Sequence, residues 1–182
     1  MAIKTFTTGE VLTAADTNTY LANSGLVYIK SQTVGSGVSS VTVSNAFSAT
    51  YDNYLVQYVG GTHSTDVDLR LQLSGATGSD YQSGILYVAW GAFTPNAAST
   101  TTTQFVWAGS ASTNSSVMSA ILLNPFLSKI TYFTNGSWDF ASGIGFASGK
   151  HTLSTSYTGF VVFGGSGTMT GGTINVYGYR KG

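Results

Sequence analysis

The hydrophobic pattern of the chain changes near residue 26, where apolar positions begin to recur with a period of two. Residues 67–73 alternate apolar and polar side chains without a break, which is typical of a half-buried antiparallel strand. Similar short runs occupy residues 26–29, 38–43, 54–59, 85–90, 104–107, 117–123, 130–133, 138–140, 160–163 and 173–179. Many short strands without intervening helices predict an all-β fold, a jelly-roll-like antiparallel β-sandwich.

Residues 1–25 have a different pattern, and we expect them to form a separate N-terminal segment before a sandwich of residues 26–182. Residues 1–11 favour an extended arm. Thr13 followed by Asp16 predicts the capped start of a helix of about ten residues, and Gly25 predicts its end. Such a short helix is not stable alone in water. We therefore expect the segment to dock onto another surface, with these anchors: Phe6, Leu12, Tyr20 and Leu21.

Several connections carry turn signals. Asn135-Gly136 predicts a tight hairpin turn. Residues 95–103, rich in Thr, Ser and Ala, predict an exposed loop, and the glycines around residues 168–170 predict a tight turn. The three tryptophans, Trp90, Trp107 and Trp138, are expected in the core.

Charge is scarce: seven basic and seven acidic residues make only 8% of the 182 residues, and they balance to zero. A balanced, dispersed charge excludes the basic footprint of a nucleic-acid-binding protein. The absence of cysteine excludes disulfides and thiolate metal sites. Because charge normally keeps soluble monomers apart, a nearly uncharged surface predicts packing against copies of the chain or against a larger particle.

Membrane and export signals are missing from the sequence. No apolar run approaches the roughly 20 residues of a membrane-spanning helix, so we expect no membrane insertion. The first residues lack the apolar stretch of a signal peptide, which predicts assembly in a cytoplasm.

Candidate catalytic chemistry is thin, and we expect no enzymatic activity. The two histidines, His63 and His151, lie far apart in the sequence and are expected at the surface. His63 is followed by Ser64 and Asp66, but catalytic triads are assembled from separate elements rather than from one loop. The single glutamate, Glu10, leaves no Glu pair for glycoside hydrolysis.

The sequence also offers one candidate cation site, although neither a metal nor a cofactor is our primary expectation. Asp66, Asp68 and Asp80 carry the oxygen ligands that calcium prefers. Asp66, Asp68 and Arg70 fall on one face of a strand, which makes an ion pair with Arg70 the simpler alternative.

Aromatic residues are abundant and suggest a binding surface. Tyr177 and Tyr179 share one face of the last strand, whereas Ile174 and Val176 share the other. Exposed tyrosines can stack on sugar rings, so these two residues are possible glycan contacts. The alternative is that they pack against neighbouring subunits.

Three segments together resemble virion proteins of tailed bacteriophages. Residues 6–29 resemble the N-terminal segment of tail-fibre and minor tail proteins, residues 51–54 (Tyr-Asp-Asn-Tyr) resemble the start of a β-sandwich module in such proteins, and residues 167–182 are similar to its last strand. The resemblance implies a virion structural protein, trimeric, with an N-terminal attachment segment and a jelly-roll-like head. It also implies a location in the virion.

The role within the particle stays open at this point. The leading expectation is a short tail-fibre or adhesion component, docked on other phage proteins through residues 1–25. The chain is shorter than most tail fibres and shows no shaft sequence, so a capsid decoration (cement) protein is an alternative. A module that binds host surface glycans is the other alternative.

Overall fold

The computed structural model describes residues 7–16, 25–91, 94–140 and 143–181, with the backbone alone over residues 136–140. Strands make up most of this structure, and the one helix in the described part is the single turn α1 (Ala14–Asp16). The prediction of an all-β fold is therefore confirmed. All strand pairs are antiparallel.

Eight of the strands form a jelly roll. They are β1 (Leu26–Thr33), β2 (Ser40–Val43), β3 (Asn53–His63), β4 (Val67–Leu73), β7 (Phe105–Ala111), β8 (Ser116–Leu123), β11 (Phe160–Gly164) and β13 (Thr173–Tyr179). They pair as a nested hairpin, β1 with β13, β2 with β11, β3 with β8 and β4 with β7. Pairing of β13 with β3 and of β11 with β4 rolls this hairpin into two four-stranded layers, the arrangement of a jelly roll.

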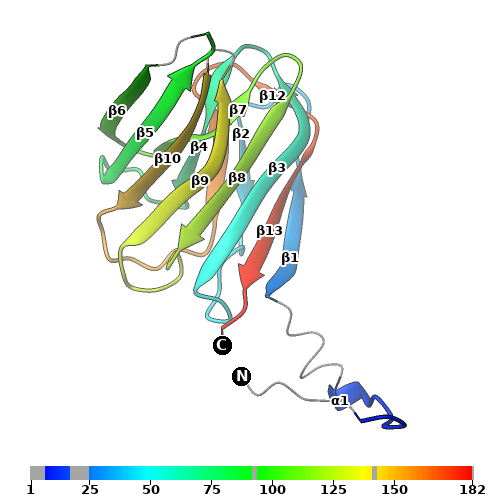
Figure 1. Ribbon diagram of the computed structural model, residues 1–182. Coiled ribbons are helices and arrows are strands. Elements are labelled where there is room, and N and C mark those ends of the chain that lie inside the picture. Colours follow the sequence, from blue (N-terminus) through cyan, green and yellow to red (C-terminus); the bar gives the residue numbers. More distant parts are fainter. Residues whose placement is uncertain (1–6, 17–24, 92–93, 141–142, 182) are drawn as a thin grey trace.

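Two inserted hairpins enlarge one layer, and we call these four strands the extension. They are β5 (Tyr81–Ala89) and β6 (Pro95–Thr102), inserted between β4 and β7, and β9 (Thr131–Phe140) and β10 (Gly143–His151), inserted between β8 and β11. They continue the layer from β8 in the order β9-β10-β5-β6. The large sheet is thus β1-β13-β3-β8-β9-β10-β5-β6, and the small sheet behind it is β2-β11-β4-β7 (Figure 1).

The main core lies between the two sheets and follows from strand alternation. In β3, Tyr54, Val56 and Tyr58 are fully buried while their neighbours are partly exposed. In β4, Leu69, Leu71 and Leu73 are buried and the polar residues between them are not. This is the period-two pattern that the sequence showed. Burial of each such side chain contributes roughly 1.5–3 kcal/mol of transfer free energy.

A second, aromatic part of the core lies beneath the extension. Tyr81 contacts Phe105 edge-on at a ring distance of 4.8 Å, and Phe105 stacks on Phe133 at 5.1 Å. The hydroxyl of Tyr81 accepts a hydrogen bond from the backbone N–H of Leu73 (3.0 Å) and donates one to the carbonyl of Ala76 (3.1 Å). These contacts join the inner face of the extension to β4 and β7.

Several connections differ from the sequence predictions. Asn135-Gly136 is not a hairpin turn but lies inside β9, at a bulge where the pairing with β10 shifts register. Residues 95–102 form the edge strand β6 rather than a loop, although most of its side chains are exposed as expected. The turn expected around residues 168–170 contains β12 (Met169–Thr170), which pairs with β3 and buries Met169 completely.

The tryptophan predictions also need correction. Trp90 is not in the core; its side chain is 59% exposed. Trp107 is half-buried and packs against the core, as expected in part. The side chain of Trp138 lies outside the described residues.

The N-terminal segment shows the predicted capping geometry. The backbone N–H of Asp16 donates to Thr13 Oγ1 (3.1 Å), and the backbone N–H of Thr13 donates to Asp16 Oδ2 (3.1 Å). This reciprocal pair begins α1 as the capping-box signal predicted. The rest of the expected helix, residues 17–24, lies outside the described residues, so its length stays a prediction.

Candidate interaction surface

The His63 segment does not assemble a catalytic triad. His63 ends β3 and is 3% exposed, so the expectation of a solvent-exposed loop residue was wrong. Its Nδ1 atom lies 2.9 Å from the carbonyl oxygen of Thr65, while Ser64 Oγ accepts a hydrogen bond from the Thr168 N–H at 2.9 Å. The serine hydroxyl therefore engages the backbone of another turn rather than the imidazole, and Asp66 is exposed.

His151 is a core histidine, which corrects the expectation of a surface residue at the start of a strand. It is the last residue of β10 and is fully buried. Its ring lies edge-on to Tyr81 at 4.4 Å and to Tyr157 at 5.3 Å, and the Tyr157 hydroxyl is 3.4 Å from Nδ1. Burial lowers the pKa of His151, and the nearby charge of Asp80 opposes that shift. Burial among aromatic rings therefore favours the neutral form of the imidazole.

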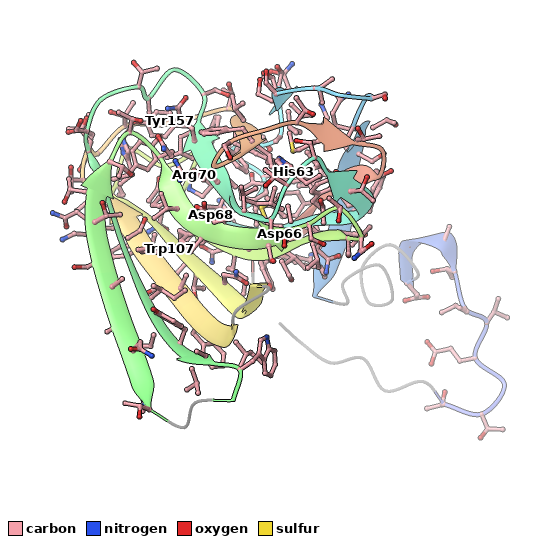
Figure 2. All side chains as sticks on the ribbon, turned by 90° about the horizontal axis from the view of Figure 1, so that it is seen from above. His63, Asp66, Asp68, Arg70, Trp107 and Tyr157 are labelled. Carbon is pink, nitrogen blue, oxygen red and sulfur yellow. The ribbon has the colours of Figure 1, made fainter. Side chains whose placement is uncertain are left out.

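The aspartates do not gather into a cation site in the described part of the chain. There, no group of three or more His, Asp or Glu side chains is arranged to hold a metal ion. Asp68 instead pairs with Arg70, with Nε 3.0 Å from Oδ2, which was the alternative that the strand pattern offered (Figure 2). The same carboxylate oxygen accepts the backbone N–H of Trp107 at 3.3 Å.

The Asp68 carboxylate stabilises an unusual backbone conformation at Trp107. Its φ of 60° places it in the left-handed region, which is unusual for a bulky residue. The distortion coincides with the register shift between β4 and β7. Asp68 thus binds a backbone N–H that the irregular ladder leaves without a regular partner.

The N-terminal arm is exposed throughout its described length. Every residue from 7 to 15 is exposed, including Val11 (78%) and Leu12 (49%). Leu12, one of the four predicted anchors, is therefore accessible to a docking partner. Phe6, Tyr20 and Leu21 lie outside the described residues.

The outer face of the large sheet, which points away from the small sheet, is unusually apolar. Nine of the thirteen large apolar side chains that are exposed in the described part of the chain lie on it. They are Leu26, Tyr28, Val59, Val117, Leu123, Tyr132, Leu86, Ile144 and Phe146. Leu86 (65%) and Phe146 (66%) are the most exposed of them, and they are directly paired neighbours in β5 and β10.

The predicted glycan contacts, Tyr177 and Tyr179, also lie on this face. As predicted, they alternate along β13 with the buried Ile174 and Val176. Both are only half-exposed, and Tyr177 packs edge-on against Tyr28 at a ring distance of 5.8 Å. Edge-on packing leaves less ring surface available to a flat ligand than a free tyrosine offers.

A polar depression of about 720 Å³ interrupts the outer face on the extension. Gly84 and Gly149 contribute no side chain to it, and Tyr132, Lys150, Gln82 and the hydroxyls of β6 surround it. Lys150 is its only charged lining residue. The sequence does not predict this depression, because a Gly- and Ser-rich strand carries no signal of the side chains that its neighbours place around it.

Comparison with known proteins adds no information on function to the fold and these surfaces. No protein-family model, curated protein or solved structure matches the chain at a significant level. The structure thus defines the class of the protein as a jelly-roll β-sandwich with a four-stranded extension. In its described part, no helix has the length and apolar character needed to cross a membrane.

Proposed function

We propose that the chain is a non-enzymatic structural protein of a tailed-bacteriophage virion, displayed on the particle and docked through residues 1–25. The observation that carries the proposal is the exposed arm. Val11 and Leu12 present apolar side chains to solvent ahead of a sandwich whose own core is complete without them. Apolar side chains on an arm gain free energy only when a partner surface covers them.

The geometry of the chain ends fits this role. Leu26 pairs with Tyr179 across β1 and β13, and the Arg180 N–H donates to the Gly25 carbonyl at 2.9 Å. The arm therefore departs from one end of the sandwich, beside the end of β13 (Figure 1). Docking through the arm would leave the rest of the sandwich displayed. A short tail-fibre or adhesion component is the role we favour, and a capsid decoration protein is the alternative.

The test uses the full chain with two substitutions in the arm, Val11→Asp and Leu12→Asp. We expect the double variant to fold normally and to be depleted from purified particles of the encoding phage. Loss of two buried apolar contacts weakens docking by about a hundredfold. Leu153→Asp, which charges an equally exposed leucine in a loop of the sandwich, is the matched control. Normal incorporation of the arm variant would refute docking through this segment.

Saccharide binding is a second candidate function, and the polar depression favours it. Tyr132, 45% exposed, offers a stacking surface, while Gln82, Lys150 and the β6 hydroxyls offer hydrogen bonds. Gly84 allows a direct test, because an added Cβ there would meet only the Ala98 carbonyl oxygen, at 3.8 Å. Gly84→Val should abolish binding on an array of bacterial surface glycans without loss of stability. An array on which the unaltered protein binds nothing would reject this candidate.

A further inference from the structure

We propose that the outer face of the large sheet is an interface between copies of this chain. The face is defined by the nine exposed side chains named above. It extends across the large sheet from β1 to β5. This inference rests on the described residues of that face alone. It does not depend on the proposed place of the protein in a virion.

The burial pattern shows that the exposed apolar residues occupy the outward positions of regular strands. In β8, Val117 and Leu123 alternate with the buried Met118 and Leu122. In β10, Ile144 and Phe146 alternate with buried small residues. Cross-strand pairing brings Leu86 beside Phe146 and Leu123 beside Tyr132, so apolar side chains flank the polar depression on both sides. Large apolar side chains gathered on one face of a domain mark an interaction site.

The size of the face matches what an interface between proteins needs. The seven strands from β1 to β5, at about 4.8 Å spacing and about 25 Å long, present roughly 800 Å². A stable interface buries about 800 Å² on each partner. A small ligand would cover only a fraction of that area, so the partner has to present a surface of similar extent.

The lack of charge favours a second copy as that partner. Among the described side chains of these strands, Lys150 is the only charged residue that points outward, and Asp52 and Lys181 pair with each other near the ends of β3 and β13. Because this face carries a single outward charge, it can meet the same face of another copy with little repulsion between like charges. It offers an oppositely charged partner nothing to recognise.

The outer surface of the small sheet provides the internal contrast. There Asp68, Arg70 and Gln72 point outward from β4, and Thr42 is exposed on β2. None of the thirteen exposed large apolar side chains of the described chain lies on these strands. The apolar character is thus specific to one side of the sandwich.

The first experiment measures the mass of the full-length protein in solution by light scattering at micromolar concentration. We expect twice the 19.0 kDa of a single chain, because a face that meets the same face of a second copy closes as a dimer. The double variant Leu86→Lys/Phe146→Lys should weaken association by about a hundredfold and give monomers with an unchanged circular dichroism spectrum. Gln72→Lys/Leu153→Lys adds the same charge off the face and should leave the mass unchanged.

A second measurement uses the absence of cysteine from the chain. Ser119→Cys places a thiol at the centre of the outer face, whereas Thr42→Cys places one on the outer surface of the small sheet. We expect maleimide to label the first thiol slowly in the oligomer and rapidly once Leu86→Lys/Phe146→Lys is added. The second thiol should react rapidly in both backgrounds.

Three results would overturn the proposal. A monomeric unaltered protein would mean that some other partner covers the face. An oligomer that survives Leu86→Lys/Phe146→Lys would place the interface elsewhere. Rapid labelling of Ser119→Cys in an intact oligomer would show that the face stays open, as the saccharide-binding candidate requires.

Discussion

Strands β3 and β4 of the jelly-roll body and strand β10 of the extension distribute large and small side chains in opposite ways. In the body, β3 and β4 point Tyr54, Tyr58 and Leu71 inward and present smaller or polar residues to solvent. In the extension, β10 points Gly143, Gly145 and Ala147 inward, and its bulky Ile144 and Phe146 face outward. Strands β3 and β4 therefore place their largest side chains in the core, whereas the largest side chains of β10 are available to a partner.

This difference also shows in the thickness of the two regions. The small sheet packs behind the body, and β7 is the strand of the small sheet whose backbone comes close to β5, β9 and β10 of the extension. The edge strand β6 is exposed on most of its residues. Because β6 and the outward side chains of β5 and β10 gain little from burial, we expect the extension to be the less stable region.

The largest expected effect on the free energy of unfolding comes from comparing one leucine substitution in each region. Leu71→Ala removes a fully buried side chain from the body and should lower the free energy of unfolding by about 2–5 kcal/mol. Leu86→Ala removes a side chain that is 65% exposed and should cost less than about 0.5 kcal/mol when measured on monomers. Denaturant unfolding of both variants checks this. Equal losses would mean that Leu86 is part of the core.

A second contrast lies within the extension, at two glycines on opposite faces. A Cβ at Gly145 would lie 2.4 Å from the Leu86 carbonyl oxygen and 2.6 Å from the Tyr87 Cβ. Gly145→Ala should therefore cost about 1–3 kcal/mol through overpacking. At Gly84 an added Cβ would meet only the Ala98 carbonyl oxygen, at the ordinary contact distance of 3.8 Å, so Gly84→Ala should be close to neutral. Thermal unfolding of the pair distinguishes them, and a neutral Gly145→Ala would show that the strands can separate locally without loss of stability.

The same glycines show what the sequence could and could not predict. Strands 67–73 and 173–179 were predicted with the bounds that the structure has, because each alternates large apolar and polar residues. Residues 143–151 gave no strand signal, because β10 buries Gly and Ala against a closely approaching β5. A local pattern cannot show that small residues are buried, since the reason lies in the partner strand.

The outer face escaped prediction for a related reason. In β8 both sets of alternating positions include large apolar residues, so the pattern does not say which set faces the core. The hairpin turn predicted at Asn135-Gly136 was wrong because a strong local turn signal is accommodated as a bulge inside β9. The ion pair of Asp68 with Arg70 was foreseeable from spacing, whereas its bond to the irregular backbone at Trp107 was not.

Asp68 provides a third test, on the body side of the comparison. Asp68→Ala removes the ion pair with Arg70 and the acceptor of the Trp107 N–H, and it should cost about 1–2 kcal/mol. Arg70→Ala, which leaves the Trp107 bond in place, should cost less, because an ion pair that is partly exposed contributes little. Denaturant unfolding ranks the two variants. If Arg70→Ala cost more, the ion pair and not the backbone bond would be the main role of Asp68.

Acid should affect the extension before it affects the body, because the buried His151 lies at the end of β10. Its pKa in the folded state is lowered by burial, so between that value and the unfolded value of about 6.5 the unfolded chain binds one more proton. The stabilising effect of the neutral ring is thus complete above about pH 6.5 and declines as the pH falls, by at most about 1.4 kcal/mol per pH unit.

Hydrogen exchange at pH 5 and pH 7 locates this acid effect within the fold. We expect amides of β10 and β5 to lose protection at the lower pH while those of β3 and β4 keep it. His151→Phe keeps an aromatic ring between Tyr81 and Tyr157 and removes the titrating group, so it should abolish this difference. Asp80, whose charge opposes the shift, offers the converse variant: Asp80→Asn should lower the pKa of His151 further and widen the acid-sensitive range. Uniform loss of protection across both regions would instead mean that the extension and the body unfold as one cooperative unit.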